Sequence, residues 1–88
     1  MKKNTKITIY SSSLCGYCYR AKSLLISKNI EFQEIDIDED FTKKDEMVFK
    51  SKGSTSVPQI FFGEHHIGGC DDLLYLEELG KLDGLKGK

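Results

Sequence analysis

Two cysteines, Cys15 and Cys18, are separated by only two residues, and this spacing constrains the fold more than any other feature of the chain. A strand-like run at 7–10 precedes the pair, and a helix-like run at 19–28 follows it. A Cys-x-x-Cys pair between a strand and a helix is typical of a redox-active dithiol. At a helix N-terminus, free backbone N–H groups and the positive end of the helix dipole favour the thiolate, which is the nucleophilic form of cysteine.

The order of the two cysteines predicts their roles. Cys15 comes first, at the expected helix start, and is the candidate nucleophile. Cys18 follows three residues later, which places it one turn along on the same helix face. It can therefore reach Cys15 and resolve a mixed disulfide. Arg20 and Lys22 add positive charge nearby, although both are expected to be solvated.

Two other interpretations of the pair remain open. A structural zinc site needs two further ligands with suitable spacing, and only Cys70, His65 and His66 remain. The two histidines are neighbours in an expected strand, so their side chains point to opposite faces. We therefore expect no metal site. The pair can also be inert and buried, as free cysteines often are, but the helix-start position of Cys15 argues against this.

Length and composition predict one small domain over residues 1–88. The chain of 88 residues is 39% hydrophobic and 31% charged, which is ordinary for a globular protein. A net charge of −1 gives no reason to expect nucleic acid or an anionic membrane as a partner. No apolar run approaches the length of a membrane span. The basic N-terminal segment has no signal-peptide pattern, and three cysteines do not suit a disulfide framework. We expect a cytoplasmic protein.

Hydrophobic periodicity predicts the element order β-α-β-α-β-β-α. The crossover helix makes the first two strands parallel, with a right-handed connection, and the segment 57–67 forms an antiparallel hairpin. The fold class is therefore α/β, with a four-stranded mixed sheet flanked by helices on both faces. The expected strands are 6–10, 30–37, 57–62 and 65–67, and the expected helices are 16–28, 41–52 and 70–79.

The same patterns predict which side chains are buried. The first strand is expected to be central, and the imperfect alternation of 30–37 suits a strand buried on both faces. The acidic run 36–40 is expected to be a solvated turn that supplies negative charge to the next helix start. The apolar side chains expected to face the core from the last two helices are Phe41, Met47, Val48, Phe49, Leu73, Leu76 and Leu79.

Three motifs in this order resemble the signatures of the glutaredoxin family. They are Cys15-Gly-Tyr-Cys18, Ser56-Val57-Pro58-Gln59-Ile60-Phe61 and Ile67-Gly68-Gly69-Cys70-Asp71-Asp72-Leu73. The resemblance covers nearly the whole chain and is closest to the small bacterial members. It implies a thioredoxin-like fold and a monomeric, glutathione-dependent thiol–disulfide oxidoreductase. The implied substrates are protein–glutathione mixed disulfides and protein disulfides, reduced through the Cys-x-x-Cys pair.

The resemblance also implies a glutathione site made by Tyr17, Lys44, Val57, Pro58, Cys70, Asp71 and Asp72. Val57, before a cis Pro58, would pair with the cysteinyl part of glutathione like an added strand. The backbone N–H groups of Cys70 and Asp71 would hold the γ-glutamyl carboxylate at a helix start, and the Asp72 carboxylate would pair with its ammonium. Simple helix capping is the alternative role for the two aspartates. The Cys70 thiol is expected to be partly buried and outside the reactive pair.

Two departures from the family pattern bear on function. Gly16 stands where the family often has proline, and members with glycine or serine there more often share a [2Fe–2S] cluster between two subunits. The alternative function is therefore a homodimeric cluster carrier that uses Cys15 and glutathione as ligands. Ser12 stands where many relatives have a lysine that holds the glycine carboxylate of glutathione. Lys44, at the start of the second helix, matches a position that often holds the same carboxylate in the family and is expected to compensate in part.

Overall fold

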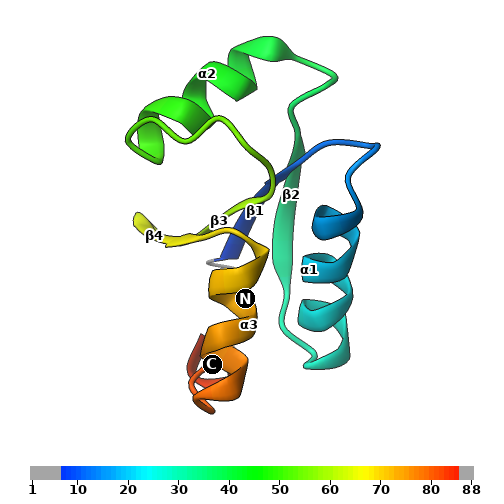
Figure 1. Cartoon of the computed structure of the whole chain (residues 1–88), viewed down its shortest axis with the longest axis vertical. Coiled ribbons are helices and arrows are strands. Elements are labelled where there is room, and N and C mark those ends of the chain that lie inside the picture. Colours follow the sequence, from blue (N-terminus) through cyan, green and yellow to red (C-terminus); the bar gives the residue numbers. More distant parts are fainter. Residues whose placement is uncertain (1–6, 86–88) are drawn as a thin grey trace, which may run out of the picture.

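The computed structural model describes residues 7–85, so the expectations for Lys6 and for residues 86–88 lie outside it. The element order is the expected β-α-β-α-β-β-α, followed by a short 3₁₀ helix (Figure 1). The elements are β1 (Ile7–Ser11), α1 (Gly16–Ser27), β2 (Phe32–Asp36), α2 (Phe41–Lys50), β3 (Gln59–Phe62), β4 (His65–Gly68), α3 (Cys70–Glu78) and η1 (Leu82–Leu85). Among residues 7–85, no helix has the length and apolar character needed to cross a membrane.

The four strands form one mixed sheet in the order β2-β1-β3-β4. Strand β1 runs parallel to β2, with Ile7 opposite Phe32, and antiparallel to β3, with Ile9 opposite Ile60. Strand β4 pairs antiparallel with β3 across the turn at Gly63. The prediction of a central first strand and a mixed four-stranded sheet is therefore confirmed.

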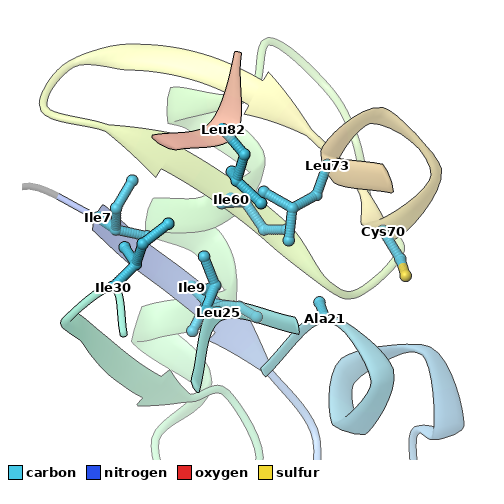
Figure 2. Close-up of a cluster of buried hydrophobic side chains, with 9 residues drawn as sticks. All are labelled: Ile7, Ile9, Ala21, Leu25, Ile30, Ile60, Cys70, Leu73 and Leu82. Carbon is cyan, nitrogen blue, oxygen red and sulfur yellow. The ribbon is translucent and has the colours of Figure 1, made fainter. Parts of the chain in front are cut away.

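One face of the sheet is covered by α1 and α3 together. Nine buried side chains form what we call the α1/α3 core, in which leucines and alanine of the helices meet isoleucines of β1 and β3 (Figure 2). The α1/α3 core consists of Ile7, Ile9, Ala21, Leu25, Ile30, Ile60, Cys70, Leu73 and Leu82. Because both helices pack on the same strands, they are held side by side.

The opposite face is covered by α2 alone. Four buried side chains form the α2 core, which consists of Tyr10, Ile37, Met47 and Phe61. The prediction that Phe41 and Phe49 face the core is wrong, since they are 78% and 84% exposed. At 3.6 residues per turn, only the stripe that holds Met47 and the half-buried Val48 can face the sheet, and the two phenylalanines fall outside it.

Two other burial predictions need correction. Strand β2 is shorter than the expected 30–37 and is not buried on both faces, because it lies at the sheet edge and exposes Gln33 and Glu34. Its two flanking isoleucines are the buried residues of this segment. In α3, Leu73 is fully buried as expected, but Leu79 is about half exposed, since it is the C-terminal cap rather than part of the packed stripe.

Candidate active site

Cys15 is the N-cap residue of α1. Its backbone is extended, with φ −126° and ψ 108°, and its Sγ accepts a hydrogen bond of 3.0 Å from the backbone N–H of Cys18. A serine, threonine, aspartate or asparagine oxygen usually occupies this position in a helix. Here a sulfur occupies the position, and the Cys18 N–H of the first turn points at it.

Cys18 lies one turn into α1 and points inward. Only 1% of the residue is exposed, and burial raises the pKa of its thiol to about 12. The side-chain hydrogen bond with Cys15 is the second cause of this raised value, and a backbone hydrogen bond from Ser12 lowers it in part. Cys18 therefore stays a protonated thiol at neutral pH, next to the more accessible Cys15. This asymmetry suits a nucleophile and a resolving cysteine.

A single carboxylate fixes the loop before Cys15. Asp38 Oδ2 accepts hydrogen bonds from the Ser12 hydroxyl at 2.7 Å, the Ser13 backbone N–H at 3.1 Å and the Ser13 hydroxyl at 3.2 Å. These bonds, the Ser12 hydroxyl first, hold the pKa of Asp38 below its usual range. Ser11 binds in the same way to Glu34, at 2.6 Å. The serine hydroxyls of this loop therefore orient the chain around Cys15 by binding protein carboxylates.

The loop before β3 approaches Cys15 from the other side. The Val57–Pro58 peptide bond is cis, as the resemblance implied. The Val57 carbonyl oxygen lies 3.7 Å from Cys15 Sγ and accepts the S–H hydrogen bond. The backbone of this loop, rather than a side chain, is thus the group that faces the cysteine. An extended ligand segment can pair with backbone that is exposed in this way, by adding as a strand.

A cleft of about 470 Å³ begins at this loop and ends at the start of α3. It is lined by Tyr17, Ser54, Ser56, Val57, Pro58, Gln59, His66, Gly68, Gly69, Cys70, Asp71 and Asp72. All of the predicted glutathione-binding residues except Lys44 therefore line one cleft. Lys44 is exposed in the first turns of α2 and is not among the lining residues.

The far end of the cleft is the N-terminus of α3. Gly69 is the N-cap, and its N–H donates a 3.0 Å hydrogen bond to Asp72 Oδ2, which is the one half of a capping box that a glycine N-cap allows. Gly68 has φ +126°, and a Cβ there would lie 2.1 Å from the same carboxylate oxygen, so a side chain would displace it. The N–H groups of the first turn, including those of Cys70 and Asp71, have no partner within the helix and form an anion-binding position.

Capping is therefore one role that Asp72 does perform, as the alternative interpretation expected. The capping bond uses Oδ2, and the same residue lines the cleft. Asp71 is exposed beside it. Both carboxylates also complement the dipole of α3, because they lie in its first turn.

The sequence did not predict a network of hydrogen-bonded side chains in the lining of the cleft. Gln59 Nε2 donates to the Ser56 carbonyl at 3.0 Å, and Gln59 Oε1 lies 2.6 Å from His66 Nε2. The His66 ring packs on Phe61 with centroids 4.8 Å apart. This network links β4 to the loop that faces Cys15. Gln59 stands in the second quoted motif, but only the pairing of β3 with β4 brings His66 to it.

The third cysteine is separate from the reactive pair. Cys70 belongs to the α1/α3 core, and burial raises the pKa of its thiol. It is more deeply buried than the sequence predicts, at 4% exposure.

Within residues 7–85, no three or more His, Cys, Asp or Glu side chains are grouped so that they can hold a metal ion.

The Gly16 departure has a simple local setting. Gly16 is the first residue of α1, and a Cβ built there would meet nothing within 4 Å. Glycine is thus not required there by packing within the chain.

Lys22, whose charge was expected near the cysteines, forms a 2.7 Å ion pair with Glu34, and that carboxylate offsets its charge.

Comparison with known proteins agrees with this geometry. The family model described as Glutaredoxin matches residues 7–67. The chain is 52% identical over 79 residues to glutaredoxin 3 of Escherichia coli K12, covering 90% of this chain and 94% of that protein. It is also 52% identical over 79 residues to a glutaredoxin of Pseudomonas aeruginosa, covering 90% and 93%.

Solved structures give the same result. A solution structure of Brucella melitensis glutaredoxin superposes with a TM-score of 0.78 at 47% identity, covering 92% of this chain and 87% of that one. The crystal structure of a buckwheat glutaredoxin–glutathione complex superposes with a TM-score of 0.82 at 29% identity, covering 91% and 74%. With the paired cysteines at a helix start beside a cis-proline loop, these matches show that the chain belongs to the glutaredoxin family of glutathione-dependent thiol–disulfide oxidoreductases.

Proposed function

We propose that Cys15 is the nucleophile of this glutaredoxin and that Cys18 is its resolving cysteine. With a protein–glutathione mixed disulfide, the Cys15 thiolate attacks the glutathione sulfur, forms a Cys15–glutathione disulfide and releases the protein thiolate, which takes up a proton. The thiolate of a second glutathione then attacks the bound glutathione sulfur. This step releases oxidised glutathione and regenerates the Cys15 thiolate.

With a protein disulfide, both cysteines are needed. Cys15 attacks one sulfur and forms a mixed disulfide with the substrate, whose other sulfur leaves as a thiolate. Cys18 loses its proton and attacks Cys15 Sγ, which closes the Cys15–Cys18 bond and releases the reduced substrate. Two glutathione molecules then reduce the bond and leave as oxidised glutathione. Glutaredoxin potentials of about −200 to −230 mV lie near that of the glutathione pool, so such exchange is reversible.

The single observation that carries the proposal is the position of Cys15 Sγ. It lies at the N-terminus of α1, receives the Cys18 N–H at 3.0 Å and lies 3.7 Å from the carbonyl oxygen of Val57, a residue that lines the cleft. Glutathione bound along the cleft would place its cysteinyl backbone against Val57 and its γ-glutamyl carboxylate at the start of α3. This arrangement brings the glutathione sulfur to Cys15.

The assignment of the remaining site residues follows from this pose. Tyr17 and Pro58 would form the sides of the cleft, and the N–H groups of Cys70 and Asp71 would bind the γ-glutamyl carboxylate. The Asp72 carboxylate would accept a hydrogen bond from the glutathione ammonium while it caps α3. Lys44 would reach the glycine carboxylate from α2, as a long, exposed side chain outside the cleft.

The test compares wild type with Cys15→Ser and Cys18→Ser in two assays. With a small glutathione mixed disulfide as substrate and glutathione reductase as the coupled enzyme, we expect Cys15→Ser to lose all activity and Cys18→Ser to keep most of it. With a protein disulfide, both variants should be inactive. If Cys15→Ser kept its activity toward the small mixed disulfide, the assignment of the nucleophile would be wrong.

Iodoacetamide modification gives an independent check on the same variants. Burial is the largest cause of the raised pKa of Cys18 and does not depend on the Cys15 thiol, so alkylation of Cys18 in Cys15→Ser should be very slow at pH 7 and should accelerate as the pH rises. Rapid modification of Cys18 at pH 7, followed by mass spectrometry, would contradict the assigned protonation state. The Cys70 thiol should also react slowly, since it is buried and its pKa is raised.

The comparisons do not favour the alternative of a [2Fe–2S] carrier, because the curated relatives are glutaredoxins that match over almost their full length.

We infer that the physiological substrates are glutathionylated or disulfide-bonded proteins. We also infer a monomer, since every group used above comes from one chain, and a single domain over residues 1–88, since all described strands belong to one sheet. A cytoplasmic location is proposed because reduced glutathione is maintained in that compartment.

A further inference from the structure

The amide of Gln59 is hydrogen-bonded at both ends in the lining of the cleft. Gln59 is 4% exposed, so its polar atoms depend on partners within the protein. Its Nε2 donates to the Ser56 carbonyl oxygen at 3.0 Å and approaches the Ser56 hydroxyl at 3.4 Å. Its Oε1 lies 2.6 Å from His66 Nε2. Because an amide oxygen only accepts hydrogen bonds, Nε2 of His66 carries the proton in this contact.

The contact with His66 decides which way the Gln59 amide faces. In the reversed orientation, the amide oxygen would lie against the Ser56 carbonyl oxygen, and two acceptors would meet. The His66 N–H binds the amide oxygen at the opposite end and so holds the observed orientation. The His66 ring is itself packed on Phe61, with centroids 4.8 Å apart. Strand β4 therefore orients the Gln59 amide through His66.

The Ser56 carbonyl belongs to the same peptide unit as the Val57 N–H. This peptide bond is trans, since the cis bond of the loop is the next one, Val57–Pro58. In a planar trans peptide the C=O and N–H groups point in opposite directions. The hydrogen bond that holds the Ser56 carbonyl therefore also fixes the direction of the Val57 N–H. Among residues 7–85, no backbone carbonyl accepts a hydrogen bond from this N–H, so it is available to a ligand.

We propose that Gln59 and His66 are positioning residues, which hold the Val57 N–H in the direction that binds the cysteinyl carbonyl of a glutathionyl group. This rests on the proposed function and deepens the description of the same site. Val57 contacts the substrate, Gln59 acts through the Ser56–Val57 peptide, and His66 acts through Gln59. The pair contributes to binding of the glutathionyl group and leaves the reactivity of the Cys15 thiolate unchanged.

Two measurements on each variant separate binding from reactivity, both at a temperature at which every variant is fully folded. The first is kcat/KM for the mixed disulfide of glutathione with mercaptoethanol, whose glutathionyl group must bind. The second is the rate of Cys15 alkylation by iodoacetamide, which needs no glutathionyl group. Gln59→Met keeps the length of the side chain and removes the amide. It should lower kcat/KM about five-fold, the order of one neutral hydrogen bond, with the alkylation rate unchanged.

Substitutions of His66 test whether it acts through Gln59. His66→Phe keeps a ring against Phe61 but removes the donor, and should lower kcat/KM about three-fold. In His66→Gln, the side-chain Nε2 is as many bonds from Cβ as in histidine, so the donor returns and kcat/KM should recover. His65→Ala is the matched control and should equal wild type, because His65 is exposed on the other face of β4 and does not line the cleft.

The double variant Gln59→Met/His66→Phe decides whether the two residues act in series. Its kcat/KM should match that of Gln59→Met alone, because His66 has no further effect once the amide is absent. Losses that multiply would overturn the proposal, and so would an unchanged kcat/KM in Gln59→Met, an equal fall in its alkylation rate, or no recovery in His66→Gln. If wild type itself fails to reduce the mixed disulfide, the proposed function is wrong and this inference falls with it.

Discussion

The two faces of the sheet differ in how much they bury and in what they support. The α1/α3 core contains nine buried side chains, all of them apolar or cysteine. The α2 core contains four, and one of these is Tyr10, whose hydroxyl donates to Glu46. The α2 side also leaves Phe41 and Phe49 exposed. The better-packed face is also the one whose helices carry the site.

This difference explains how the active site is positioned. Cys15 and Cys18 belong to the start of α1, and Asp71 and Asp72 to the start of α3. Since both helices pack on β1 and β3, the α1/α3 core holds their N-termini in a fixed relation. Sites built on such rigid elements keep their geometry better than sites on loops. The α2 layer contributes only the proposed role of Lys44, from outside the cleft.

The largest effect is expected in the α1/α3 core. Leu73→Ala removes a fully buried side chain from α3 and should lower the free energy of unfolding by about 3 kcal/mol. Because α3 also forms the end of the cleft, KM for glutathione should rise in the fraction that remains folded. Urea unfolding and the coupled assay measure the two effects. Leu79 is a half-exposed leucine at the end of the same helix, so Leu79→Ala should change the free energy of unfolding and KM for glutathione only slightly.

A smaller and purely structural effect is expected in the α2 core. Met47→Ala should cost about 2 kcal/mol of unfolding free energy, because Met47 is fully buried. At a temperature where the variant is fully folded, its activity per molecule should equal that of wild type. Loss of activity under those conditions would show that α2 supports the site as strongly as α1 and α3. Phe49→Ser is the matched control, with an expected change below about 0.5 kcal/mol for an exposed position.

The smallest effect concerns the one site residue proposed on the α2 side. Lys44→Ala should raise KM for glutathione about two- to three-fold with kcat unchanged, since an exposed ion pair contributes little. Lys50→Ala removes an exposed lysine from the far end of the same helix and should leave KM unchanged. If the two variants had the same KM for glutathione at low ionic strength, Lys44 would not be a glutathione-binding residue.

Much of the fold and part of the site were predictable because their signals are local. The periodicity of each segment predicts a helix or strand, and Asn29 and Gly80, at φ 60° and 72°, mark helix ends as expected from their types. The placement of Cys15 and Cys18 at a helix start was predictable from their spacing and from the segments on either side, and their reactivity stays a prediction. The glutathione-site residues around Val57 and Asp72 came from resemblance, and their placement along one cleft supports the proposed roles without testing them.

The sequence by itself therefore determined the order of the elements, the paired cysteines and the helix start that holds Cys15. Only the tertiary structure decided the burial of Cys18, the edge position of β2, the exposure of Phe41 and the Gln59–His66 bond. The physical reason is the range of the interactions. Helix capping and hydrophobic periodicity act within a few residues, whereas burial and side-chain pairing depend on which distant segments the sheet brings together.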